Sequence, residues 1–304
     1  KRGEKYMYHI PVMLNECIEG LEIKPDGIYV DVTFGGGGHS KEILKRLGEK
    51  GKLFAFDVDE DAKRNVPNDN RFTLIQANYR HLKRFLKLHG VTRVQGILAD
   101  FGISSHQIDE PSRGFATRFD APLDMRMNTK EGISAKDIVN TYSAEQLQNI
   151  LGFYGEVINA KTLAHKIVEQ RSIQPIETTK DLVDICKMVS KGIEVKYFSQ
   201  VFQAIRIEVN DELNAIKDFL QQSEEVLEEG GRLVIMSYHS LEDRLTKNFM
   251  KNGVFEGEPE KDVFGRFEHH LKVITRKPME ASTAELKINS RARSAKLRIA
   301  EKTK

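Results

Sequence analysis

Cysteine is scarce in this chain of 304 residues, and long apolar runs are missing. Cys17 and Cys186 lie far apart in apolar helical patterns and match no metal-ligand spacing, so we expect buried free thiols in a reducing compartment. No apolar run approaches the ~20 residues that a membrane-spanning helix needs. The basic start of the sequence is followed by no hydrophobic stretch typical of secretory signals. Together these absences predict a cytoplasmic protein.

Two kinds of catalytic motif are also missing. No cysteine–histidine cluster has the spacing of a metal site, and His269 and His270 have no carboxylate or cysteine partner at such spacing. We therefore predict no catalytic metal. Ser104 and Ser105 lack the G-x-S-x-G pattern of a nucleophile elbow, so serine-hydrolase chemistry is not expected either.

Charge of one sign does not dominate, because 47 basic residues face 45 acidic ones. The net charge therefore indicates no partner. Basic residues do concentrate between positions 287 and 304. Such a segment can contact phosphate groups, although a solvated surface strand accounts for the same charges equally well.

What the chain does have is a run of four glycines, within the segment DVTFGGGGHS at residues 31–40. The apolar residues 27–30 before it predict a buried strand, and a helical stripe after it ends at Gly48. A strand, a glycine turn and a helix form the unit that receives nucleotide-like ligands at a helix N-terminus. A turn that only reverses the chain is a weaker interpretation, because four glycines cost folding entropy.

Further strands are predicted at residues 52–56, 72–76, 95–100 and 232–237, with helical stripes between them and closing strands near 270–275 and 295–300. This alternation predicts an α/β fold with a parallel, doubly wound sheet. Asp31, Asp57 and Asp100 each close a predicted strand. Ligands of such sheets bind beyond the carboxyl ends of the strands, so we expect the three carboxylates at the site.

The alternation stops after Asp100. Residues 101–132 are rich in glycine, proline and serine, and residues 134–196 show only helical signals, including capping-box patterns at 143–146 and 178–181. We therefore predict a small all-α domain inserted at residues 109–201 into a sheet domain formed by 1–108 and 202–304.

The glycine turn favours one cofactor class over another. A dinucleotide fingerprint needs a third glycine where this chain has Ser40. The spacing from Asp31 to Gly35 and Gly37 resembles instead the first motif of S-adenosylmethionine-dependent methyltransferases. Asp57 suits bonding to ribose hydroxyls, but both cofactor classes want an acid there.

Several blocks, in order along almost the whole chain, carry a more specific resemblance. The chain resembles the RsmH (MraW) family, bacterial methyltransferases that modify N4 of a cytidine in the decoding region of 16S ribosomal RNA. The matching blocks lie at residues 9–16, 31–40, 57–59, 100–109, 113–115, 122–127, 202–213, 239–244 and 291–298.

The resemblance implies a class I methyltransferase sheet with an inserted helical domain that takes part in substrate recognition. It also implies S-adenosyl-L-methionine as cofactor and 16S rRNA, within the small ribosomal subunit, as partner; a monomer and a homodimer both stay open. The cofactor contacts that it implies are Asp31, Gly35, Gly37, Gly38, His39, Asp57, Tyr79, Asp100 and Gln107.

Two positions depart from the family pattern. Gln200 stands where relatives carry an arginine, so the RNA contact attributed to that arginine is not carried over. Tyr238 replaces the more usual phenylalanine before the block at 239–244.

Methyl transfer to the amine of cytosine needs a hydrogen-bond acceptor, because the ring delocalises the nitrogen lone pair. The [DNS]-P-P-aromatic tetrad of amino-methylating DNA enzymes is absent, so we take Asp100, Ser104 and Ser105 as candidates. Each candidate for RNA binding also has an ordinary surface or capping interpretation. These candidates are Arg113, Arg126, His239, Arg291 and Arg293.

Two other functions stay open at this point. One is methylation of a protein or a small molecule, which the near-neutral charge permits. The other is a non-catalytic RNA-binding or ribosome-assembly factor that keeps the fold; the retained Gly35, Gly37 and Asp57 argue against it.

Overall fold

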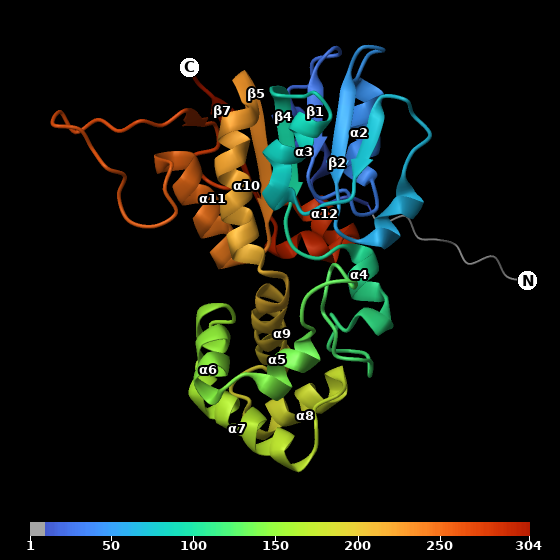
Figure 1. Ribbon diagram of the computed structural model, residues 1–304, viewed down its shortest axis with the longest axis vertical. Coiled ribbons are helices and arrows are strands. Elements are labelled where there is room, and N and C mark those ends of the chain that lie inside the picture. The colour runs from blue at the N-terminus through green and yellow to red at the C-terminus, as the bar shows by residue number, and fades with distance from the viewer. Residues whose placement is uncertain (1–9) are drawn as a thin grey trace, which may run out of the picture. The chain divides into compact units, whose positions relative to one another are not determined.

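The computed structural model describes residues 10–304, which form two compact units (Figure 1). One unit contains the chain up to Gly102 and from Asn214 onward, and the other runs from Ile103 to Leu213. The first unit carries the sheet and the second is helical. Of the described helices, none combines the length and the apolar character needed to cross a membrane.

The sheet has seven strands in the order β3-β2-β1-β4-β5-β7-β6. Its first five members run parallel, and β7 pairs antiparallel with both β5 and β6. The predicted α/β fold is therefore confirmed, but the sheet is mixed rather than wholly parallel, because β7 is antiparallel to both of its neighbours. The strands are β1 (Ile28–Asp31), β2 (Lys52–Phe56), β3 (Phe72–Ile75), β4 (Val94–Asp100), β5 (Leu227–Ser237), β6 (Leu271–Val273) and β7 (Lys296–Lys302).

Strand β5 begins earlier than the sequence indicates. The paired glycines Gly230 and Gly231 suggest a helix end with a strand from residue 232, yet the strand already begins at Leu227. Val94 of β4 pairs with Leu227, and a register shift follows before Gly96. The glycines thus lie inside an irregular strand, which is a usual place for glycine in a sheet.

The helices of the sheet unit lie on both faces of the sheet, as β7 illustrates. Successive side chains of a strand point to opposite faces. Leu297 and Ile299 pack in the core cluster that contains Cys17, whereas Arg298 bonds Asp243 on the other face. The helices are α1 (Leu14–Leu21), α2 (Gly38–Arg46), α3 (Leu82–Leu88), α10 (Glu212–Val226), α11 (Ser240–Asn252) and α12 (Thr283–Ile288).

The helical unit has its own apolar core, which includes Leu147, Leu163 and Ile205. Capping boxes start four of its helices, with Ser104, Ser134, Ser143 and Thr178 as N-caps; the last two were predicted from sequence. Both free cysteines of the chain are buried, Cys186 in this unit. Its helices are α4 (Ser105–Asp109), α5 (Ala135–Thr141), α6 (Ala144–Phe153), α7 (Ala160–Ile173), α8 (Thr179–Val189) and α9 (Glu194–Asn210).

Candidate functional site

The carboxyl ends of the central parallel strands bring together the polar residues that the sequence singles out. Asp31 ends β1, Asp57 follows β2, Asp100 ends β4, and Tyr238 follows β5. Because β1, β2, β4 and β5 run parallel, these ends meet at one edge of the sheet. The edge is the candidate site.

The glycine turn between β1 and α2 is held in a shape that side chains resist. Gly35 and Gly37 have positive φ angles of 51° and 76°. A Cβ on Gly37 would lie 2.9 Å from the Phe34 ring, and one on Gly38 would lie 2.2 Å from Pro11. The turn therefore needs glycine at these positions, both for conformation and for space. Gly36 is different, since a Cβ there would meet nothing within 4 Å.

Asp31 stabilises this turn through two hydrogen bonds. Its carboxylate accepts hydrogen bonds from the Ser40 hydroxyl at 2.6 Å and from the Thr33 amide at 3.1 Å. The side chain is only 1% exposed, and burial raises its pKa from the model-compound value of 3.8 to about 6. Asp31 thus acts within the turn, and Ser40 is its partner rather than a substitute for a third glycine.

Asp57 closes the turn from the neighbouring strand. Its carboxylate accepts hydrogen bonds from the Gly35 amide at 2.7 Å and the Asp59 amide at 2.9 Å. Burial raises its pKa to about 6, although both amides oppose the change. Each carboxylate oxygen has two lone pairs, so both can still accept a hydroxyl hydrogen.

Asp100 is fixed at both its backbone and its side chain. Its amide donates to the Thr33 hydroxyl at 2.7 Å, and its Oδ1 accepts the Tyr238 hydroxyl at 2.6 Å. Burial raises the pKa of Asp100 to about 6, whereas His39 and the Tyr238 hydroxyl favour the ionised form. Neither contact could be foreseen from sequence, although Tyr238 was noticed as a departure from the family.

His39 and Tyr79 occupy different surroundings at this edge. His39, in the first turn of α2, is buried with its Nε2 3.2 Å from the Val12 carbonyl, and burial lowers its pKa. Tyr79 is partly exposed after β3, and its ring centroid lies 5.9 Å from that of Phe101 and 5.4 Å from that of Phe219. The three rings form an aromatic cluster in which Tyr79 is the accessible one.

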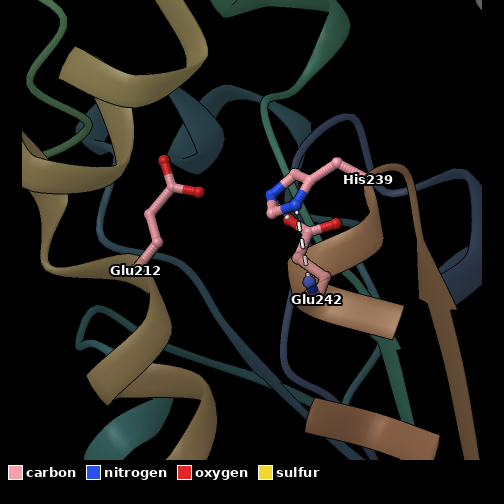
Figure 2. Close-up of side chains that lie close together, drawn as sticks. All are labelled: Glu212, His239 and Glu242. Atoms are coloured by element: carbon pink, nitrogen blue, oxygen red, sulfur yellow. Dashed lines mark hydrogen bonds and ion pairs between the residues drawn. The ribbon is translucent and has the colours of Figure 1, made fainter. Parts of the chain in front are cut away.

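His239 caps helix α11, which is the capping role left open by the sequence. Its Nδ1 accepts the Glu242 amide at 3.4 Å, and its Nε2 lies 3.1 Å from Glu242 Oε1. Figure 2 shows the imidazole of His239 directly beside the Glu242 carboxylate. Glu242 is fully buried, and its Oε2 accepts the Tyr238 amide at 2.9 Å. This network therefore fixes the chain immediately after β5.

Within the helical unit, Ser104, Ser105 and Gln107 belong to the start of α4. Ser104 and Gln107 form a reciprocal capping box, and Gln107 is only 4% exposed. The Ser104 hydroxyl thus accepts the Gln107 amide, while Ser105 is the first residue of the helix.

The two arginines of the following loop, which were candidates for RNA binding, form hydrogen bonds within that loop. Arg113 is 7% exposed, and its guanidinium donates to the carbonyls of Arg126 and Met127 at 3.1 and 3.0 Å. Arg126 forms a bidentate pair with Asp124. Asn210 bonds the backbone of Met127 at 2.8 Å, a contact that sequence reasoning missed.

The basic C-terminal segment is only partly available to solvent. In the 3₁₀ helix Ser290–Ser294, Arg293 is exposed and Arg291 is partly buried. Glu285 of α12 accepts the Met13 amide at 2.7 Å, so this segment is tied to the start of α1. Arg293 is therefore the more accessible of the two arginines.

Comparisons with known proteins bear on the same site. The family model described as "MraW methylase family" matches residues 6–303. Proteins named "Ribosomal RNA small subunit methyltransferase H" are similar: that of Flavobacterium johnsoniae is 57% identical over 296 residues, 97% of this chain and 98% of its own. That of Flavobacterium psychrophilum is 59% identical over 291 residues, 95% of this chain and 100% of its own.

Among solved structures, a putative rRNA-methylase from Clostridium thermocellum is similar at 13% identity with a TM-score of 0.44, covering 97% of this chain and 99% of its own. The identification of the family depends on the sequence matches, which span nearly the full chain at more than half identity. The chain belongs to the MraW methylase family.

Proposed function

We propose that this protein transfers a methyl group from S-adenosyl-L-methionine to the exocyclic N4 of a cytidine in the decoding region of 16S ribosomal RNA. The observation that carries the proposal is the match of the whole chain to a methylase family and to relatives named as methyltransferases of small-subunit ribosomal RNA. The cytidine and its N4 atom are what the resemblance to the RsmH family implies, and that resemblance depends on all nine blocks together.

The chemistry of the strand ends fits such a cofactor. Asp57 keeps acceptor capacity for a ribose diol, and the partly exposed Tyr79 offers a ring face for an adenine. The glycine turn at Gly35, Gly37 and Gly38 lets a ligand approach the backbone, since no side chain projects from it. His39 and Gln107 are assigned as cofactor contacts on the motif alone.

When bound, the cofactor supplies an electrophilic methyl group on a sulfonium. The residues of this chain then have two tasks, which are to align the amine with that methyl group and to accept its N–H. We assign the acceptor role to Asp100, because Thr33 holds its backbone amide at the carboxyl end of β4 and Tyr238 donates to its carboxylate. Ser104 and Ser105 are the second candidates.

We further propose that the substrate is recognised by the helical unit together with the exposed Arg293. A base in structured RNA must be splayed from its neighbours to be methylated, so contacts beyond the reacting base are needed. If Arg293 neutralises a phosphate, its removal should reduce the slope of log affinity against log salt by about one. An unchanged slope would remove Arg293 from the interface.

The decisive experiment gives S-adenosylmethionine with a labelled methyl group to purified small ribosomal subunits and to naked 16S RNA. Nucleoside analysis should find the label in N4-methylcytidine with at least one of the two substrates. Label in another nucleoside would overturn the assigned acceptor. Transfer to neither substrate, with the fold intact, would instead favour a non-catalytic RNA-binding factor.

A further inference from the structure

Tyr238, the residue directly after β5, contacts the candidate acceptor Asp100 and is itself held by hydrogen bonds. Its hydroxyl donates to Asp100 Oδ1 at 2.6 Å. Its amide donates to Glu242 Oε2 at 2.9 Å, and Glu242 in turn lies against His239 at the start of α11. The tyrosine is thus fixed at the backbone by α11 and at the ring tip by the carboxylate.

The hydroxyl remains a donor throughout the range in which proteins function. Burial raises the pKa of Tyr238 well above its ordinary value, and the nearby Asp100 charge acts in the same direction. An O–H bond to a carboxylate of this length is a charge-assisted hydrogen bond, about twice as strong as a neutral one. A phenylalanine at this position would offer the ring without the donor.

The second oxygen of Asp100 is left for another donor. Among residues 10–304, no side chain or amide donates a hydrogen bond to Oδ2. The bond from the Asp100 amide to Thr33 holds the backbone, and the bond from Tyr238 to Oδ1 orients the carboxylate. Oδ2 is therefore an acceptor prepared for an N–H group.

We propose that Tyr238 is a positioning residue of this methylase, which orients the Asp100 carboxylate and keeps it ionised so that Oδ2 accepts an N–H from the cofactor or from the target amine. This inference depends on the proposed function, because it assigns Tyr238 to the same site. The two sources of the N–H share one chemistry, and separate measurements distinguish them.

The surroundings of Asp100 explain why a neutral donor matters there. Asp31 on β1 and Glu242 on α11 disfavour its negative charge, and His39 on α2 favours it. Cys17 on α1 also faces it, but burial raises the pKa of this thiol, so it stays neutral. Burial lowers the pKa of His39, so this residue carries little positive charge at neutral pH. Within residues 10–304, the bond from the Tyr238 hydroxyl is thus the one direct hydrogen bond that favours the ionised carboxylate.

The test is the replacement Tyr238→Phe, with the affinity for S-adenosylhomocysteine measured by calorimetry between about pH 5.5 and 8.5. If Oδ2 accepts the ammonium of the cofactor, the wild-type affinity falls as Asp100 is protonated, with a midpoint near pH 6. Loss of the hydroxyl should raise that midpoint by about one pH unit. Near pH 6 the variant should bind about fivefold more weakly, and at pH 8.5 both proteins should agree within about twofold.

If Oδ2 accepts the target amine instead, Tyr238→Phe should shift the pH profile of single-turnover methyl transfer to the RNA by the same amount. The affinity for S-adenosylhomocysteine should then stay unchanged. The matched control is Tyr29→Phe, which also removes a hydroxyl from a buried ring. Tyr29 bonds the Lys24 amide at 2.8 Å, and it lies on β1 outside the site, so neither profile should move. A purely structural role of Tyr238 would lower affinity or rate equally at every pH.

A double replacement separates the possible failures. In an Asp100→Asn background the Tyr238→Phe change should leave both pH profiles unchanged, because the group that titrates has been removed. The inference is overturned if Tyr238→Phe shifts neither midpoint, or if its effect persists in the Asp100→Asn protein. Wild-type protein that binds no S-adenosylhomocysteine and transfers no methyl group would refute the proposed function itself.

Discussion

The buried carboxylate of Asp31 makes a stability prediction that can be worked out from the structure. Its pKa is about 6 in the folded protein, against 3.8 for the model compound that represents the unfolded chain. Between these two values the folded state binds the extra proton, so stability is highest below pH 3.8 and is lost as the pH rises to about 6. A difference of about two pH units corresponds to about 3 kcal/mol.

The perturbation is Asp31→Asn, which removes the titration and keeps the side-chain shape. The new amide rearranges the bonds to Ser40 and Thr33, and this adds an offset that does not depend on pH. The free energy of unfolding of the wild type minus that of the variant should therefore fall by roughly 2–3 kcal/mol between about pH 4 and pH 7.5. Urea denaturation at a series of pH values measures this difference, in which titrating groups that do not interact with Asp31 cancel. The Asp31 charge also raises the pKa of Asp57 and of Asp100, so these two groups add a smaller fall in the same direction.

A control replacement with the opposite pKa change makes the test sharper. Hydrogen bonds from the guanidinium and the backbone amide of Arg71 lower the pKa of Asp69 to about 2, so that Asp69 stays ionised from about pH 4 upward. The corresponding difference for Asp69→Asn should be flat over the same range. A flat difference for Asp31→Asn as well, or one that grows with pH, would refute the argument that burial outweighs its two hydrogen bonds.

Three further outcomes are expected. Asp57→Ala should weaken binding of S-adenosylhomocysteine by about 100-fold in calorimetry, because a charge-assisted pair of bonds is lost; affinity within a few-fold of wild type would remove Asp57 from the site. Gly37→Ala should destabilise the fold by about 1–2 kcal/mol in urea, whereas Gly36→Ala, which has open space, should change stability little; equal effects would contradict the strained turn. Asp243→Asn should cost about 3–5 kcal/mol because it leaves a buried guanidinium without its carboxylate, and adding Arg298→Met should recover most of the loss in the same denaturation assay.

Much of the fold follows from local patterns in the sequence. The strand positions, the capping boxes at Ser143 and Thr178, and the three aspartates at strand ends all depend on residues close together in the chain. The pairing of β7 between β5 and β6 could not be predicted in this way, because it depends on long-range packing rather than on local periodicity.

The site shows the same division. The glycine turn and the acids were predicted from spacing, and the structure places them at one edge of the sheet. The bond between Tyr238 and Asp100 joins residues 138 positions apart, and that between Met13 and Glu285 joins residues 272 positions apart. The burial of Arg113 could not be predicted from the sequence either, because the sequence of a polar loop does not show which carbonyls an arginine will bond.

The discontinuity of the sheet unit has a consequence for how the chain is made. The helical unit is one continuous segment and can fold as soon as residue 213 has left the ribosome. The sheet unit cannot, because β5 and β7 are translated after that segment and β7 must insert between β5 and β6. During synthesis one edge of β4 therefore stays unpaired until β5 has been translated, and one edge of β5 stays unpaired until β7 has been translated. This methylase should thus gain its tertiary structure in two separate stages during translation, with the helical unit first and the cofactor site last.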